Sequence, residues 1–273
     1  MHRNLEEVEF IIFDTETTGL DPKAGDRIVE IAAVKLKAGK KIDAFESLVN
    51  PQREISPGAF AVNHITQEML EGAPDMAEIM PVFFDFIQGS CLCCYNAPFD
   101  MGFLNNELGI IGKSVPKEIV VIDILKMARR LMPDLQRHAL WFVADRLGIK
   151  FSQQHRAMAD VDMTVGVFNK FAQMLKQKDI SDFLNFSNLF AIEPVLLNEL
   201  NESKVVQIQR AMDLGTKIKI RYLSGSSVEV TEREVTPREI RREKNNIYLI
   251  GFCGLRNEER YFRVDGILHL EII

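Results

Sequence analysis

The sequence predicts an α/β fold in which a mixed sheet flanked by helices precedes a smaller β-rich domain. Three observations support this: strand-like segments open the chain, strands then alternate with helical segments, and short strands of period two close it. The 273 residues suffice for a medium domain plus a small one, and an apolar content of 47% suffices for hydrophobic cores. We therefore expect a folded protein.

The early strands follow from apolar runs that are rich in aromatic and β-branched residues. Residues 9–14 are typical of a buried strand, and 28–36 and 44–49 predict two more, separated by a Lys/Gly turn at 37–41. The next segments alternate between the two element types. We expect helices at 76–87, 99–108, 124–131, 139–147 and 157–176, and strands at 91–95 and 119–122.

A change of pattern near Val205 predicts a second domain. From there the chain carries 12 Lys and Arg against 10 Asp and Glu, net +2, which leaves −8 for the rest of a chain of net charge −6. We expect a helix to Leu214 and then strands of period two, with the mixed-charge run 238–244 as an exposed loop. The predicted division is a first domain at 1–176, a mostly helical connector at 177–204 and a β domain at 205–273.

Composition excludes several classes of protein. A net charge of −6 and a pI near 5.5 argue against a protein that coats nucleic acid through charge alone. Four cysteines, three of them at 91, 93 and 94, are too few for a disulfide scaffold and favour a reducing compartment. Their one Cys-x-x-Cys spacing leaves zinc or redox chemistry open, although a buried strand favours packing. With no secretory pattern and no uncharged stretch of ~18 residues, we expect a cytoplasmic protein without a membrane partner.

Two carboxylates, Asp14 and Glu16, stand at the end of the first predicted strand. Period two sends both side chains to one side of the sheet. Like charges at the edge of a core are unfavourable unless a cation lies between them. A divalent metal site is one interpretation, and a strand that simply ends in water is the other.

Three separated segments make the metal interpretation specific. Residues 14–19 (DTETTG), 95–100 (YNAPFD) and 155–160 (HRAMAD) resemble the signatures of the DEDDh 3′-to-5′ exonucleases, the family that includes the proofreading epsilon subunit of bacterial DNA polymerase III. Residues 26–32 and 133–135 are similar to further stretches of that family. The resemblance covers about 8–176 and implies a ribonuclease-H-like fold.

The resemblance also implies a mechanism and its residues. Asp14, Glu16, Asp100 and Asp160 would bind two Mg²⁺ or Mn²⁺ ions, and hard cations of this kind prefer oxygen ligands. His155 would be the general base, since an imidazole can accept a proton near neutral pH. Because His155 lies five residues before Asp160, about 140° away on a continuous helix, we expect it on a loop or first turn. Taken alone, a histidine near a helix start is more often a surface or capping residue.

Further residues are assigned to the substrate by the same resemblance. It places six of them around the last nucleotide: Thr15, Leu20, Asn63, His64, Asn96 and Phe99. Phe99 is expected either to stack on a base or to belong to the core. Tyr95 departs from the family, which often has His at that position.

Residues 205–273 resemble a WYL domain through 220–222 (IRY), 247–251 (IYLIG) and 260–267 (RYFRVDGI). This implies an Sm/SH3-like β-barrel that binds nucleic acid or nucleotide ligands. The family commonly has another Arg where this chain has Gly266. Stacking faces and phosphate contacts are expected from Tyr222, Tyr248, Arg256, Arg260 and Arg263. Alternatively, these arginines pair with Glu258, Glu259 and Asp265 on a solvated surface.

The leading hypothesis is therefore a metal-dependent 3′-to-5′ exonuclease with a C-terminal nucleic-acid or ligand-binding domain. Its partner would be DNA or RNA with a free 3′ end, single-stranded at that end, and a polymerase or repair protein is a further expected partner. One alternative is a non-catalytic regulator acting through the WYL-like domain, and another is an exoribonuclease that trims RNA ends. The complete set of four acids argues against the regulator.

Overall fold

The computed structural model describes residues 3–151, 155–192, 195–225, 228–243 and 246–273, with the backbone alone for 195–199. The ten strands have these bounds: β1 (Glu9–Thr17), β2 (Ile28–Lys37), β3 (Lys40–Leu48), β4 (Cys91–Cys94), β5 (Val121–Asp123), β6 (Ile218–Leu223), β7 (Val230–Glu243), β8 (Asn246–Cys253), β9 (Glu258–Arg263) and β10 (Ile267–Ile272).

Eight α-helices and four 3-10 helices complete the described part of the chain. The α-helices are α1 (Pro57–Asn63), α2 (Met76–Ile87), α3 (Ala97–Ile110), α4 (Ile124–Leu131), α5 (Leu140–Arg146), α6 (Ala157–Lys176), α7 (Phe183–Phe190) and α8 (Val195–Leu214). The 3-10 helices are η1 (Leu5–Glu7), η2 (Pro22–Ala24), η3 (Glu68–Leu70) and η4 (Val264–Gly266). None of the helices within the described ranges has both the length and the apolar content of a membrane span.

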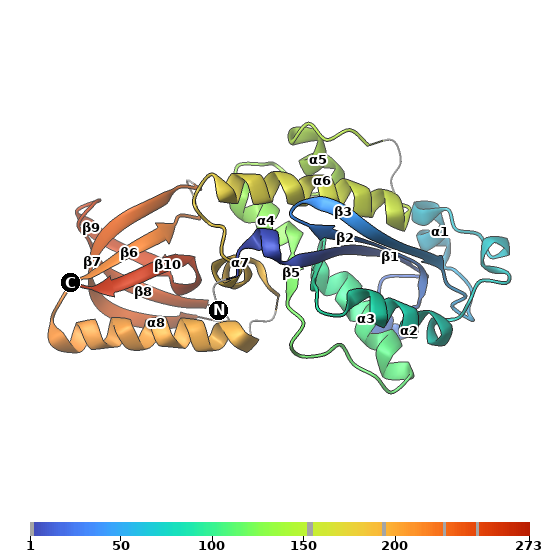
Figure 1. Ribbon diagram of the computed structural model, residues 1–273, viewed down its shortest axis with the longest axis horizontal. Helices are drawn as coiled ribbons and strands as arrows, with labels where there is room; N and C mark the ends of the chain where they lie inside the picture. Colours follow the sequence, from blue (N-terminus) through green and yellow to red (C-terminus); the bar gives the residue numbers. More distant parts are fainter. Residues whose placement is uncertain (1–2, 152–154, 193–194, 226–227, 244–245) are drawn as a thin grey trace.

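The first sheet has the strand order β3-β2-β1-β4-β5 (Figure 1). β1 pairs antiparallel with β2, whereas β1, β4 and β5 run parallel, so the predicted mixed sheet is confirmed. Alternate residues of its strands enter two cores. The residues on one side pack against α4, α5, α6 and α7, and those on the other pack against α2 and α3. The three cysteines of β4 lie buried in these cores and are free.

Local sequence signals explain where the helices begin. α2 starts at a capping box, in which the Asp75 side chain accepts from the Glu78 amide and Glu78 accepts from the Asp75 amide. α4 starts at Asp123, which accepts from the Leu125 amide. α2 and α4 have the predicted bounds because such signals coincide with an apolar face. α6 also has the predicted bounds, although its N-cap, Arg156, makes no side-chain capping bond.

The second sheet is antiparallel, with the order β10-β6-β7-β8-β9, and α8 packs against it (Figure 1). β7 pairs with β6 through its first half and with β8 through its second, with a register shift between Pro237 and Glu239. The expected exposed loop at 238–244 is therefore wrong for its described residues, since 238–243 extend β7. Their mixed charges suit a strand whose side chains face solvent.

Closure of this sheet into a barrel stays a prediction. Among the described residues, β9 and β10 stand at the two ends of the hydrogen-bonded order, which makes the sheet open. β10 was not expected, although its sequence ILHLEI alternates as a strand should.

Candidate active site

The first sheet brings three carboxylates together. Asp14 and Glu16 share one face of β1, the face on which Phe10 and Ile12 join the core beneath α6. Asp160 lies in the first turn of α6. One carboxylate oxygen from each of these acids lies within 4.8 Å of the other two. The structure thus assembles three of the four predicted ligands.

The fourth acid, Asp100, is held from the α3 side of the sheet. It occupies the first turn of α3 and is 2% exposed. Its Oδ1 accepts the Thr15 amide at 3.0 Å and the Thr15 hydroxyl at 2.8 Å. These bonds tie Asp100 to the strand beside Asp14, outside the group of three. Thr15, expected to contact substrate, here directs its polar groups at Asp100.

Electrostatics at the site are those of uncompensated negative charge. Burial, and then the Asp100 and Glu16 carboxylates, raise the pKa of Asp14 well above its usual range. Burial first, and then Asp160, raises the pKa of Glu16 to about 8. Burial also raises the pKa of Asp100 to about 7 although Thr15 opposes it. A cation among these oxygens would offset both the repulsion and the desolvation.

His155 lies one residue before Arg156, the N-cap of α6, and is exposed. Its backbone is left-handed, with φ of 59°, and its amide donates to Asp160 Oδ2 at 2.8 Å. This bond places His155 next to the carboxylate cluster without making it part of the helix. The residues just before it, 152–154, lie outside the described ranges.

Two charged residues at this site were not singled out from the sequence. Glu30 faces Glu16 across the β1–β2 pair and is 1% exposed. It forms an ion pair with Arg156 and accepts the Ala157 amide at 2.9 Å. Their only local signal is their place within family-like stretches, because the pairing joins residues 126 positions apart.

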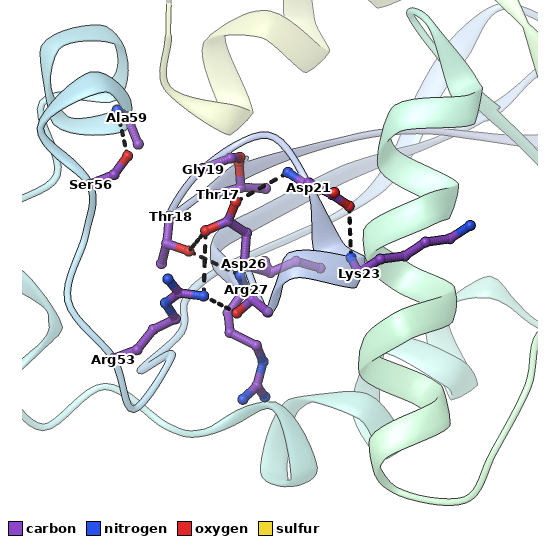
Figure 2. Close-up of polar contacts among 12 residues, drawn as sticks. Thr17, Thr18, Gly19, Asp21, Lys23, Asp26, Arg27, Arg53, Ser56 and Ala59 are labelled. Atoms are coloured by element: carbon purple, nitrogen blue, oxygen red, sulfur yellow. Dashed lines mark hydrogen bonds and ion pairs between the residues drawn. The ribbon is translucent and has the colours of Figure 1, made fainter.

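The loop after β1 presents Leu20, which is 83% exposed. Figure 2 shows how Asp26 organises this loop from the inside. Asp26 Oδ1 accepts the Thr18 hydroxyl at 3.0 Å, and Oδ2 accepts the Asp21 amide at 3.1 Å. A Cβ at Gly19 would lie 2.2 Å from Asp26 Oδ2, so the carboxylate packs directly on the glycine backbone. Asp26 thus defines the turn that exposes Leu20.

Asn63 and His64 lie at the end of α1, close to the same loop. The buried Asn63 side chain donates through Nδ2 to the Thr17 carbonyl at 3.3 Å, and its Oδ1 accepts the Ile65 backbone amide at 3.1 Å. His64 is the left-handed C-cap of α1, is exposed, and contacts Phe60 edge-to-face. Asn63 therefore links α1 to β1, while His64 remains accessible.

Asn96 and Phe99 lie at the start of α3. Asn96 is the exposed, left-handed N-cap, and its backbone amide donates to Asp123 Oδ1 at 3.2 Å. Phe99 is half-buried and contacts Phe103 with ring centroids 5.0 Å apart. Phe99 therefore belongs to the edge of the core while keeping part of its ring exposed.

The five candidate ligand residues of the second sheet do not form one exposed group. Tyr222 is buried against Phe262 at a centroid distance of 5.2 Å, while Tyr248 is half-buried opposite Arg263 in the β8–β9 register. Arg256 is exposed in the turn after β8. Two of the expected alternative pairings are present: Arg260 with Glu258 at 2.8 Å and Arg263 with Asp265 at 2.5 Å.

Comparison with known families agrees with both halves of the chain. The exonuclease family model, RNase_T, matches residues 11–168, and the WYL domain model matches residues 203–272. DNA polymerase III PolC-type from Oceanobacillus iheyensis is 39% identical over 186 residues, 68% of this chain and 13% of the relative. Its counterpart from Staphylococcus epidermidis is 32% identical over 250 residues, 91% of this chain and 17% of the relative. The chain thus spans less than a fifth of the length of these relatives.

Solved structures share the fold at low sequence identity. E. coli Exonuclease I in complex with a dT13 oligonucleotide has a TM-score of 0.58 at 18% identity, covering 90% of this chain and 55% of that one. The nuclease domain of 3′hExo bound to rAMP has a TM-score of 0.56 at 18% identity, covering 66% of this chain and 97% of that one. The first sheet and its helices thus have the predicted ribonuclease-H-like exonuclease fold. The chain belongs to the exonuclease family, as its DEDDh signatures predicted, and carries a C-terminal WYL domain.

Proposed function

We propose that this chain is a metal-dependent 3′-to-5′ exonuclease that releases nucleoside 5′-monophosphates from the 3′ end of DNA. The observation that carries the proposal is the convergence of Asp14, Glu16 and Asp160, with oxygens within 4.8 Å of one another, in a chain of the exonuclease family. DNA is favoured because the relatives at 32–39% identity are DNA polymerases.

The donor set fits hard divalent cations. All the converging ligands are carboxylates, and the cysteines are buried and free. Asp14, Glu16, Asp100 and Asp160 would hold two ions, Mg²⁺ or Mn²⁺. When bound, such a pair lowers the pKa of an attacking water and offsets charge on the leaving 3′ oxygen.

Residues of the protein itself would accept the proton of the attacking water and hold the site in position. The backbone amide of His155 donates to Asp160, which brings this exposed residue next to the cluster, where its imidazole would accept the proton of the attacking water. Arg156, bound to Glu30, keeps this segment in place. Thr15 donates two hydrogen bonds to Asp100 and so holds this acid against β1, beside Asp14.

The last nucleotide would lie across the ends of β1 and β4. Leu20 offers an exposed apolar contact, and the partly exposed ring of Phe99 offers a stacking face. His64 and Asn96 are exposed and provide polar contacts nearby, whereas the buried Asn63 supports the loop.

We also propose the division into an exonuclease domain at 1–176, a connector at 177–204 and a WYL domain at 205–273. The two family matches, at 11–168 and 203–272, support these limits. The WYL domain would hold nucleic acid or a nucleotide ligand, and a polymerase is the favoured protein partner because the relatives are polymerases.

A ladder assay tests the proposal. A 5′-labelled single-stranded DNA should shorten in single-nucleotide steps with Mg²⁺ or Mn²⁺, and not with EDTA. Asp160→Ala should lower the rate more than ~100-fold, since even outer-shell losses at metal sites cost ~10–100-fold. The matched control is Asp162→Ala, an exposed acid two residues away, which should retain the rate.

The alternatives predict different gels. Equal shortening by wild type and Asp160→Ala, or shortening in EDTA, would contradict the proposal. Binding of the strand with no shortening would favour the non-catalytic regulator. A parallel RNA substrate that shortens at least as fast as DNA would favour the exoribonuclease.

A further inference from the structure

Arg130 of α4 is a buried guanidinium with few partners. Its side chain is 9% exposed. Nη2 donates to the Leu223 carbonyl at 3.4 Å, and Nη1 lies 3.8 Å from Asp265 Oδ2. No residue in the described part of the chain accepts a hydrogen bond from Nε. A guanidinium has five donors, and buried donors are normally satisfied, so this geometry points to an absent acceptor.

The surroundings of Arg130 carry an excess of positive charge. Lys126 lies four residues earlier on the same helix and donates to the Ala191 carbonyl at 3.1 Å. Arg263 binds Asp265 through Nε at 3.1 Å. Burial lowers the pKa of Lys126. Asp265 opposes this shift, and the neighbouring Arg263 and Arg130 add to it, so these charges interact electrostatically. Three cations share Asp265, and Asp123 acts on Lys126 as well, which leaves one positive charge in excess.

The backbone at this junction is shaped around the guanidinium. Gly266 lies in η4, and a Cβ there would approach Arg130 Nη2 to 2.8 Å and Tyr222 Cε2 to 2.9 Å. Any larger residue at this position would displace one of these groups. Glycine therefore permits an arginine of the exonuclease domain to reach into the C-terminal sheet.

The cluster remains open to solvent on one side. The Arg263 side chain is 38% exposed and the Asp265 side chain is 16% exposed, and Lys126 is half-buried. A small ion can therefore reach Arg263 from solvent, at the edge of the cluster. Tyr248, opposite Arg263 in the sheet and half-buried, adds an aromatic face at the same edge.

We propose that the junction between α4 and the C-terminal sheet binds a phosphate group through Lys126, Arg130 and Arg263. A phosphate group supplies the negative charge that the cluster lacks. Its oxygens accept charge-assisted hydrogen bonds from guanidinium groups, which suit phosphate geometry. The phosphate belongs either to a free nucleotide or to a nucleic-acid strand. Two of its three ligands come from the exonuclease domain, so the site exists only where the two domains meet.

Calorimetric titration of the full chain in EDTA tests the proposal, because chelation excludes metal-bound phosphate at the carboxylate cluster. The probes are inorganic phosphate, thymidine 5′-monophosphate and a (dT)₆ strand. We expect binding of at least one probe, weakened at least ~10-fold by Arg130→Gln, since charge-assisted bonds are the strong ones. The matched control is Arg129→Gln, an exposed arginine one residue away, which should bind as wild type.

A second variant separates binding from folding. Asp265→Asn removes the carboxylate that competes with phosphate, so it should bind the probes more tightly than wild type, with its melting curve recorded to verify folding. A preference for (dT)₆ assigns a strand and a preference for the mononucleotide assigns a free nucleotide, and either supports the site. Absence of binding to all three probes, unchanged affinity in Arg130→Gln, or weaker binding in a folded Asp265→Asn would each overturn it.

Discussion

Arg156 and Glu30 form a bidentate ion pair that links the start of α6 to β2 of the first sheet. Arg156 Nε lies 3.1 Å from Glu30 Oε2, and Nη2 lies 2.5 Å from Oε1. The same carboxylate accepts the Ala157 amide, so it also caps the helix. Because His155 precedes this anchor and Asp160 follows it, the pair holds both candidate site residues in place.

Removing that anchor should cost both stability and activity. Arg156→Ala leaves the Glu30 carboxylate, 1% exposed, without its partner. Breaking a buried pair costs ~3–5 kcal/mol, and since the arginine is about a third exposed we expect ~2 kcal/mol here. Urea unfolding measures this loss, and the ladder assay should show a slower rate. Lys41→Ala, which breaks an exposed pair with Asp162, should change stability by less than ~0.5 kcal/mol. Equal midpoints for the two variants would refute the anchoring role.

The carboxylate cluster should destabilise the metal-free protein. Burial and neighbouring acids raise the pKa of Asp14, so its ionised form opposes folding. In EDTA, Asp14→Asn should therefore raise the melting temperature by a few degrees, which corresponds to about 1 kcal/mol or more in the free energy of unfolding. Added Mg²⁺ should stabilise wild type more than this variant. Calorimetric melting with and without Mg²⁺ measures both effects, and a less stable Asp14→Asn in EDTA would argue against repulsion at the site.

Asp26 should act on the substrate through Leu20. Without its carboxylate, the Thr18 hydroxyl and the Asp21 amide lose their acceptor, and the turn at Gly19 loses its support. Asp26→Ala should lower kcat/KM on an oligonucleotide by roughly 10-fold, about 1.4 kcal/mol. The p-nitrophenyl ester of thymidine 5′-monophosphate keeps only the last nucleotide, which Leu20 contacts in this account, so Asp26→Ala should slow its hydrolysis as well.

A double-mutant cycle is the control for this prediction. If Asp26 works by presenting Leu20, then Asp26→Ala should add little to the effect of Leu20→Ala. Fully additive losses would mean that the two residues act independently.

Lys204 should make stability depend on pH. It is 6% exposed and donates to the Ile267 carbonyl, and burial lowers its pKa to about 8 from 10.5. The folded state thus binds fewer protons than the unfolded state between about pH 8 and pH 10.5. The free energy of unfolding therefore rises with pH across this window, and the gain is lost again as the pH falls from 10.5 to 8. Relative to Lys204→Met, wild type should gain roughly 3 kcal/mol from pH 7.5 to pH 10.5, measured by urea unfolding. Parallel curves for the two proteins would show that the lysine is not desolvated.

Local pattern was enough to predict much of the fold. α2 and α4 have the predicted bounds because apolar periodicity and their capping signals agree. The second half of β7 was missed because Arg241 and Arg242 sit among acids in a run without apolar alternation. What makes it a strand is pairing with β8, a contact that composition does not encode.

The candidate site likewise contains residues that the sequence predicts and contacts that only the fold creates. Asp14 and Glu16 were predictable because period two is a property of one strand. The pairing of Glu30 with Arg156 and the burial of Arg130 against Gly266 depend on segments that are far apart in the chain. Such contacts leave no periodic trace in the sequence, so only the folded structure reveals them.

The most direct test of the central claim is anomalous diffraction at the manganese edge from crystals of the full chain soaked in Mn²⁺. We predict anomalous peaks bonded to Asp14, Glu16 and Asp160, with Asp100 completing the set, and their loss in Asp14→Asn. Wild-type crystals without a peak among these oxygens would contradict the account.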